Sequence, residues 1–280
     1  MTKQTAVPKL PSERSSHDST YESRILCTLR NVDSFFESNK IPYAVFGGSG
    51  VACYLGHLPR KIHDIDLLIS ETDVPRAKRF LRSSGYVLQN TFKSRKASFL
   101  KYSLKNHLYE MVVSIFPGKF TLLDLEDPAL TPFEEFDFRP AIRASSRREI
   151  NSLSSASQQA VSVRVLPIED LLISKFWPVV EPTTIHDSYF LLTKVILTGK
   201  VRFDWDYFAS RVGSNAAIAN ICLQTFDRLV QLYSRTVWFE PSRDNDRFED
   251  LILRIASVLR SSGSHPTTTR RRSKRLLEII

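Results

Sequence analysis

The chain has 280 residues, of which 42% are hydrophobic, and a formal net charge of +9. This length and apolar content allow a sizeable core, in one elaborated domain or two small ones. No apolar run is long enough to cross a membrane, and the N-terminal stretch lacks the apolar segment of a signal peptide. Cys27, Cys53 and Cys222 lie far apart, are odd in number and show neither the paired spacing of a zinc site nor a disulfide framework, so we expect a reducing, intracellular compartment.

Much of the net positive charge lies at the C-terminal end. The segment TTTRRRSKRLLEII, over 267–280, holds five basic residues and a single acidic one, Glu278, so the rest of the chain is only mildly basic. We interpret 263–280 as a solvated basic tail, with a nuclear-import signal or an RNA-binding tail as alternatives. The expected location is the cytoplasm, or the nucleus if the tail is an import signal.

The N-terminal half predicts a small mixed sheet with flanking helices. After a disordered start over 1–18, apolar residues at helical spacing predict a helix from about 20 to 39. A second helix is expected near 73–84. Short apolar segments predict strands at 43–46, 64–70, 86–92, 97–104 and 108–116. The sequence KNH between the last two strands predicts a hairpin turn.

The C-terminal half predicts helices. A polar, serine-rich stretch at about 148–162 is interpreted as a surface loop, and VRVLP after it as one more strand. Helical spacing of apolar residues then recurs in five segments, at 168–177, 185–196, 204–212, 216–233 and 248–259. The predicted fold class is therefore α+β, with a core over 19–166 and a helical C-terminal domain over 167–262.

The stretch FGGSGVACYLGHLPRKIHDIDLLIS carries the clearest functional signal. Asp64 and Asp66 are two apart on a predicted strand, so both carboxylates project from one face. Two such carboxylates repel each other unless a cation neutralises them, and hard oxygen ligands suit Mg²⁺ that carries phosphate groups. Gly47 and Gly48 would let backbone N–H groups approach a phosphate at the start of the following helix. This order of elements predicts a triphosphate cradle.

These residues resemble the signature of the nucleotidyltransferase superfamily related to DNA polymerase beta, a Gly-Gly or Gly-Ser turn followed by a strand with two acidic residues. RKIHDIDLLI is similar to the same strand in minimal nucleotidyltransferases and type IV abortive-infection (AbiEii-like) toxins. Arg60 matches that pattern, and Ile62 stands where threonine is usual. The resemblance implies a nucleotidyltransferase core and a nucleotide site that includes Arg60 and Ser49.

The resemblance also implies a third acidic residue from a later strand. Glu110 matches the hydrophobic-acidic-hydrophobic pattern and is the preferred position, with Asp124 as the alternative. A turn at KNH would place Glu110 on one strand face with Val112 and Ser114. Asp124 follows a proline and a glycine in a segment with the composition of a loop.

The likeness continues in the helical half. VLPIEDLLISKFW and IHDSYFLL are similar to the next two helices of these families, and Lys175 and Asp187 match their pattern. Thr184 and His186 stand in place of basic residues, and no second aspartate follows. Lys175 is therefore assigned either to the triphosphate or to packing of its aliphatic stem over the core.

The activity implied by the resemblance is the transfer of an NMP from an NTP to an acceptor hydroxyl, with release of pyrophosphate. Asp64, Asp66 and Glu110 would bind two Mg²⁺ ions. The acceptor is a small molecule, the 3′ end of a tRNA or a protein, and mild basicity favours RNA. The alternative is a catalytically inactive module on the same fold that binds a nucleotide or RNA. No membrane partner is expected, and the oligomeric state is left open.

Overall fold

The structure, a computed structural model, describes residues 19–93, 100–106, 111–122, 134–151, 160–176, 182–233 and 245–263. The predicted N-terminal segment and all but the first residue of the predicted tail lie outside these ranges.

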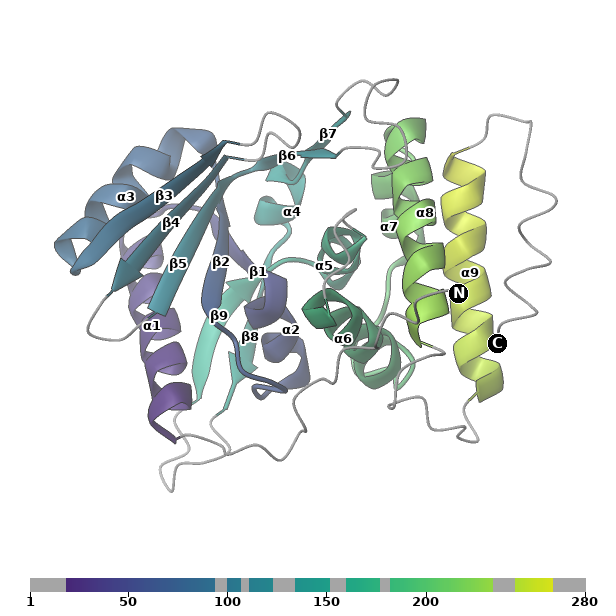
Figure 1. Ribbon diagram of the computed structural model, residues 1–280, viewed down its shortest axis with the longest axis horizontal. Coiled ribbons are helices and arrows are strands. Elements are labelled where there is room, and N and C mark those ends of the chain that lie inside the picture. Colours follow the sequence, from purple (N-terminus) through teal and green to yellow (C-terminus); the bar gives the residue numbers. More distant parts are fainter. Residues whose placement is uncertain are drawn as a thin grey trace, which may run out of the picture.

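Seven of the described strands form one mixed sheet, in the order β3-β4-β5-β2-β1-β9-β8 (Figure 1). Their bounds are β1 (Tyr43–Phe46), β2 (Asp64–Ile69), β3 (Tyr86–Lys93), β4 (Leu100–Asn106), β5 (Met111–Pro117), β8 (Ser146–Ile150) and β9 (Val161–Val165). β2 lies inside the sheet, antiparallel to β1 and parallel to β5. The predicted class, a mixed sheet with flanking helices followed by a helical region, is confirmed.

Helices α1 (Ser19–Ser38) and α3 (Val74–Ser83) pack together behind the sheet in Figure 1, with the rings of Phe35 and Phe80 stacked 3.6 Å apart. Tyr43 of β1 faces α1, because its hydroxyl donates a hydrogen bond to Asp33. Tyr43 pairs with Ile69 of β2. Since side chains alternate along a strand, the even-numbered residues of β2 lie on the face away from α1.

The predicted hairpin between the fourth and fifth strands is confirmed. β4 and β5 run antiparallel, and Asn106 pairs with Met111. The four residues between them lie outside the described residues. The placement of the turn at KNH is wrong for its first two residues, because Lys105 and Asn106 belong to β4 and pair with Val112 and Met111.

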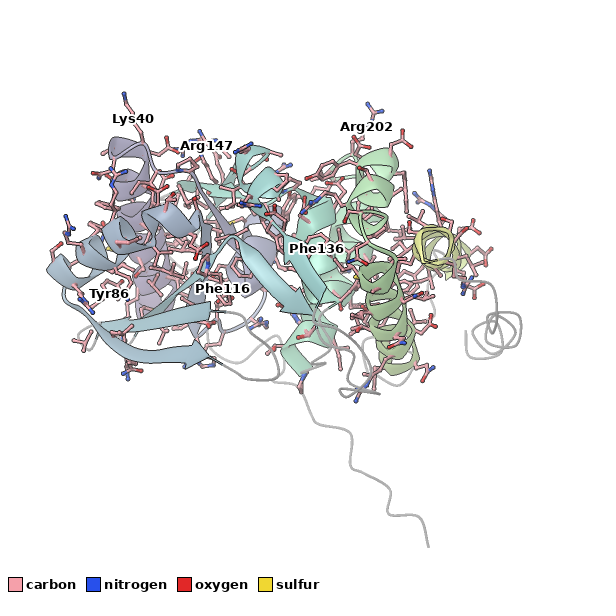
Figure 2. The ribbon with its side chains drawn as sticks, turned by 90° about the horizontal axis from the view of Figure 1, so that it is seen from above. Lys40, Tyr86, Phe116, Phe136, Arg147 and Arg202 are labelled. Atoms are coloured by element: carbon pink, nitrogen blue, oxygen red, sulfur yellow. The ribbon has the colours of Figure 1, made fainter. Side chains whose placement is uncertain are left out.

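The surface loop predicted over 148–162 is wrong at both ends, because β8 continues to Ile150 and β9 begins at Val161, and these strands pair antiparallel. β8 is the edge strand of the sheet, so its charged side chains meet solvent and lack the alternation that marks a strand in sequence. Arg147 of β8 lies on the outer surface (Figure 2) and pairs with Asp33 at 3.1 Å.

Three short elements have no counterpart in the sequence predictions. β6 (Lys119–Leu122) and β7 (Glu134–Asp137) form a separate antiparallel pair, and α4 (Arg139–Arg143) follows them. Each has only four or five residues. Such lengths are too short for a period to be recognised.

All five segments predicted as helical fall on described helices. These are α5 (Ile168–Lys175), α6 (Pro182–Phe190) with a π-helical continuation over Leu191–Ile196, α7 (Trp205–Val212), α8 (Ala216–Tyr233) and α9 (Asn245–Ser262). Along the described part of the chain, no helix combines the length and the hydropathy that crossing a membrane requires.

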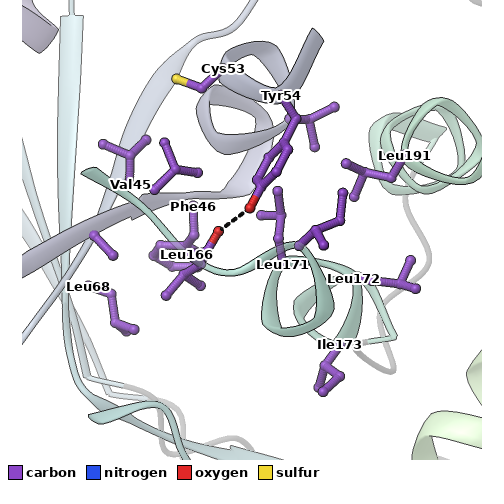
Figure 3. Close-up of a cluster of buried hydrophobic side chains, with 14 of the residues drawn as sticks. Val45, Phe46, Cys53, Tyr54, Leu68, Leu166, Leu171, Leu172, Ile173 and Leu191 are labelled. Atoms are coloured by element: carbon purple, nitrogen blue, oxygen red, sulfur yellow. Dashed lines mark hydrogen bonds between the residues drawn. The ribbon is translucent and has the colours of Figure 1, made fainter. Parts of the chain in front are cut away.

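The helical region packs directly on the sheet region through α2 (Gly47–Leu55). The hydroxyl of Tyr54 on α2 donates a hydrogen bond of 2.8 Å to the carbonyl of Leu166, just after β9 (Figure 3). Leu171 of α5 lies on Gly50, where a Cβ would be 3.1 Å from its Cδ1 atom. These contacts are buried. The predicted boundary between a core domain ending at 166 and a helical domain beginning at 167 stays a prediction.

Candidate active site

The site begins at the glycine turn between β1 and α2. α2 starts at Gly47, whose φ of +64° is in the left-handed region that favours glycine. A Cβ at this position would lie 2.1 Å from Oδ2 of Asp66, a separation that no real side chain tolerates. The carboxylate of Asp66 therefore lies directly against the backbone of the turn.

Asp64 and Asp66 open β2 and share the face away from α1, as the strand predicts. Asp66 pairs with Phe46, the last residue of β1. Both aspartates are half-buried. The paired carboxylates are therefore presented at the end of the sheet where α2 begins.

Ser49 joins the first turn of α2 to β2. Its side chain is buried, and its hydroxyl donates a hydrogen bond of 3.3 Å to the backbone carbonyl of Asp64.

At the other end of α2, the ammonium of Lys200 donates a hydrogen bond of 2.6 Å to the carbonyl of Leu55. A cation suits the negative end of the helix dipole, and the positive end is at the glycine turn.

A cluster of two cations and one anion lies on the other side of the turn. Arg60 donates from Nε and Nη2 to the two oxygens of Asp187, at 2.9 and 2.8 Å. Lys175 donates from Nζ to Oδ2 of the same carboxylate at 2.8 Å. A Cβ at Gly48 would lie 2.7 Å from Nη2 of Arg60. The sequence-predicted residues Arg60 and Lys175 are thus brought together at the glycine turn.

The charges of this cluster stabilise one another. Burial alone would raise the pKa of Asp187, but Lys175, the neighbouring His186, and Arg60 outweigh it and hold that pKa well below its usual range. Burial would lower the pKa of Arg60, and its hydrogen bond and charge pairing with Asp187 raise it instead. Asp187 is therefore ionised, and the cluster of Arg60, Lys175 and Asp187 carries one net positive charge.

Glu110 and Asp124, the two positions predicted for the third acidic residue, both lie outside the described residues. β5 pairs Val112 with Asp64 and Ser114 with Asp66. The even-numbered residues of β5 therefore share the face of the aspartates, which is the register that the choice of Glu110 assumed. The choice itself stays a prediction.

Ser114 was not assigned to the site from sequence. It is fully buried beside Asp66, and its hydroxyl has no hydrogen-bond partner within the part of the chain that the structure describes. An unpaired buried hydroxyl is unfavourable unless a further group reaches it. Only the pairing of β5 with β2 reveals this position, since a serine in an apolar strand has no sequence signal of its own.

The oxygen donors around β2 fit a divalent cation. Asp64 and Asp66 supply carboxylates on one face, and the buried hydroxyl of Ser114 lies in register beside them. Such hard oxygen ligands suit Mg²⁺. Within the described ranges, no group of three or more His, Cys, Asp or Glu side chains is placed to hold a metal. A complete two-ion site would therefore need a ligand from elsewhere, as the prediction of Glu110 requires.

A glycine turn that opens a helix, followed by a strand with paired aspartates in a mixed sheet, defines a protein of the nucleotidyltransferase superfamily. Residues 13–178 match the family described as "Uncharacterised nucleotidyltransferase", and the chain belongs to that family. No curated protein matches the sequence significantly.

Several solved structures resemble the chain at low identity. The lincosamide antibiotic adenylyltransferase LnuA, with lincomycin bound, is 19% identical with a TM-score of 0.40, covering 61% of this chain and 95% of its own. ANT(2")-Ia, in complex with adenylyl-2"-tobramycin, is 13% identical with a TM-score of 0.43, covering 73% of this chain and 98% of its own. A putative nucleotidyltransferase from Thermotoga maritima is 19% identical with a TM-score of 0.35, covering 51% and 79% respectively. These likenesses give no information about the substrate of this chain.

Proposed function

We propose that the protein is a Mg²⁺-dependent nucleotidyltransferase that moves an NMP from an NTP to an acceptor hydroxyl and releases pyrophosphate. One observation carries this proposal. Two adjacent glycines are contacted from both sides, Gly47 by the carboxylate of Asp66 and Gly48 by the guanidinium of Arg60. A carboxylate suited to a metal ion and a guanidinium suited to a phosphate therefore both reach the start of one helix.

Each side chain has a role in this reaction. Asp64 and Asp66, together with Glu110, would hold two Mg²⁺ ions, which neutralise charge on the triphosphate and lower the pKa of the attacking hydroxyl. Arg60 and Lys175 would bind phosphate oxygens. Because the hydroxyl of Ser49 is bonded to the carbonyl of Asp64, we assign the phosphate contact to the backbone at the start of α2.

Nucleotide transfer exchanges one bond to phosphorus for another. The acceptor oxygen attacks the α-phosphorus of the NTP and forms a new phosphoester bond. The bond between the α-phosphorus and its bridging oxygen breaks, and pyrophosphate leaves with that oxygen. Glu110 accepts the proton of the acceptor hydroxyl. Arg60 and Lys175 would compensate the negative charge that develops on the departing phosphates.

The acceptor is proposed at the level of its chemistry, a hydroxyl on a small molecule, on the 3′ end of a tRNA or on a protein. Mild basicity outside the tail favours RNA, and the expected location is the cytoplasm, or the nucleus if the tail is an import signal. The experiment incubates purified protein and cell extract with each α-labelled NTP and Mg²⁺. Label is then separated into RNA, protein and small-molecule fractions.

Label in one fraction, absent with Asp64→Asn, supports the proposal and identifies the acceptor class. Binding of an NTP without any transfer would favour the alternative, an inactive nucleotide-binding module. Label in no fraction and no NTP binding would contradict both.

A further inference from the structure

We propose that Asp187 is a positioning residue of the nucleotide site, which holds the guanidinium of Arg60 and the ammonium of Lys175 together at Gly48 to receive a triphosphate. This proposal rests on the function proposed above, because it takes a triphosphate as the ligand of the two cations.

The three side chains come from separate parts of the fold. Arg60 lies between α2 and β2, Lys175 ends α5, and Asp187 lies within α6. Asp187 accepts two hydrogen bonds from Arg60 and one from Lys175, and its Oδ2 atom is shared by both cations at 2.8 Å. One carboxylate therefore sets the distance between a cation of the sheet region and a cation of the helical region.

The cluster lies at the same turn as the paired aspartates. At Gly48, a Cβ would be 2.7 Å from Nη2 of Arg60 and 3.6 Å from Oδ2 of Asp187. Its neighbour Gly47 contacts Asp66. A triphosphate bound along the start of α2 would therefore meet the cations on one side and the acidic pair on the other.

Two roles for Asp187 predict opposite effects on anion binding. If Asp187 only neutralised the cations, removing its charge would raise the local positive charge and strengthen triphosphate binding. If it positions them, removal would weaken binding, because two long cationic side chains would regain rotamer freedom and no longer be held at the turn. The burial of the carboxylate and the ammonium favours positioning, since the side chain of Asp187 is only 2% exposed and that of Lys175 only 9%.

Asp170 provides a matched control. It is fully buried on α5 and accepts hydrogen bonds from the hydroxyl of Tyr207 at 2.6 Å and from Nε of Arg211 at 2.8 Å. The guanidinium of Arg211 lies 4.6 Å from the ring centre of Phe136, a residue of β7 that is labelled in Figure 2. Loss of this carboxylate removes an equally buried ion pair that does not include Arg60 or Lys175.

The experiment measures binding of inorganic tripolyphosphate to the full chain by calorimetry, for wild type, Asp187→Asn, Asp187→Glu and Asp170→Asn. We expect Asp187→Asn to weaken binding roughly tenfold or more, as loss of hydrogen bonds to a charged group implies. Asp187→Glu keeps the charge and moves the carboxylate by one methylene, so it tests positioning if the asparagine variant does not fold. We expect it to weaken binding as well, and Asp170→Asn to leave the affinity within about twofold of wild type, since it changes no contact of either cation.

The outcomes separate this inference from the proposed function. Unchanged or tighter tripolyphosphate binding by both Asp187 variants would overturn the positioning role, even if the wild type transfers nucleotides. Absence of binding by the wild type would overturn it too. If tripolyphosphate binds as expected but no NTP is turned over, the positioning role stands and the proposed transfer fails. If NTPs are turned over, the Asp187 variants should raise the KM for NTP, which loss of stability alone would not do.

Discussion

The carboxylate of Asp66 occupies the space that a side chain would need at Gly47, where a Cβ would come within 2.1 Å of Oδ2. Asp66 and Gly47 therefore depend on each other. The turn must be glycine for the aspartate to lie there, and the aspartate is held at the start of α2 because the turn has no side chain.

Replacing Gly47 by alanine should abolish nucleotide transfer, because the methyl group would displace the carboxylate of Asp66. The left-handed φ of Gly47 would also cost an alanine about 1–2 kcal/mol of conformational free energy. Gly199 is the matched control, since its φ is +67° and nothing lies within 4 Å of the point that a Cβ would occupy. Gly199→Ala should show a similar backbone cost in urea unfolding and keep its transfer rate. Equal loss of transfer in both variants would contradict the role of the Gly47 contact.

Glu110→Gln should lose turnover at saturating NTP and Mg²⁺, while Asp124→Asn keeps it. The reason is the register of β5, which places Val112 beside Asp64 and so puts even-numbered residues on the face of the acidic pair. A third carboxylate is what a two-ion site requires. Steady-state rates of the two variants decide between them, and the reverse pattern would make Asp124 the third ligand.

The protein should become less stable as pH decreases through the acidic range in which Asp187 becomes protonated in the unfolded chain. Burial would raise its pKa, but Lys175, His186 and Arg60 hold it well below the usual value. Because the folded pKa is depressed, the stabilisation is fully present above the unfolded value of about 3.9 and is lost as pH falls below it. Melting temperatures of wild type and Asp187→Asn, compared from about pH 7 down to about pH 3, should converge toward the acid end. A constant difference across this range would show that the carboxylate charge contributes nothing to stability.

Tyr54→Phe should destabilise the protein by about 1–3 kcal/mol, because the carbonyl of Leu166 would lose a buried partner. The hydrogen bond of 2.8 Å links α2 to a residue just before α5 (Figure 3). Tyr54 does not contact the glycine turn through this bond, so KM for NTP should stay near the wild-type value. Denaturant unfolding measures the first effect, and a midpoint equal to wild type would show that the bond is not made in solution.

Much of the central sheet could be predicted because its strands are buried. β1 has the predicted bounds and β2 ends one residue before the predicted strand, since β1 is an apolar run before the glycine turn and β2 ends in one. β8 could not be predicted, because an edge strand with charged side chains has no apolar alternation. The hairpin of β4 and β5 could be predicted from two apolar segments close together in the sequence, although Lys105 and Asn106 of the predicted turn belong to β4.

The acidic pair could be predicted and the cation cluster only in part. Asp64 and Asp66 are two residues apart, so strand geometry alone puts them on one face. Arg60 and Asp187 are separated by 127 positions in the sequence. Their contact depends on how α6 packs against the sheet region, and no local pattern encodes that packing. The resemblance to helices of known families pointed to Asp187, but it did not indicate which side chains Asp187 contacts.

The most direct test of nucleotide transfer follows the α-phosphate and the γ-phosphate of the NTP separately. Wild-type protein, with Mg²⁺ and the acceptor fraction, receives NTP labelled at either the α- or the γ-phosphate. We predict α-label in the acceptor and γ-label in pyrophosphate, with both lost in Asp64→Asn and Asp66→Asn although these variants stay folded. Label from the γ-phosphate in the acceptor, or wild-type rates in either aspartate variant, would contradict the account.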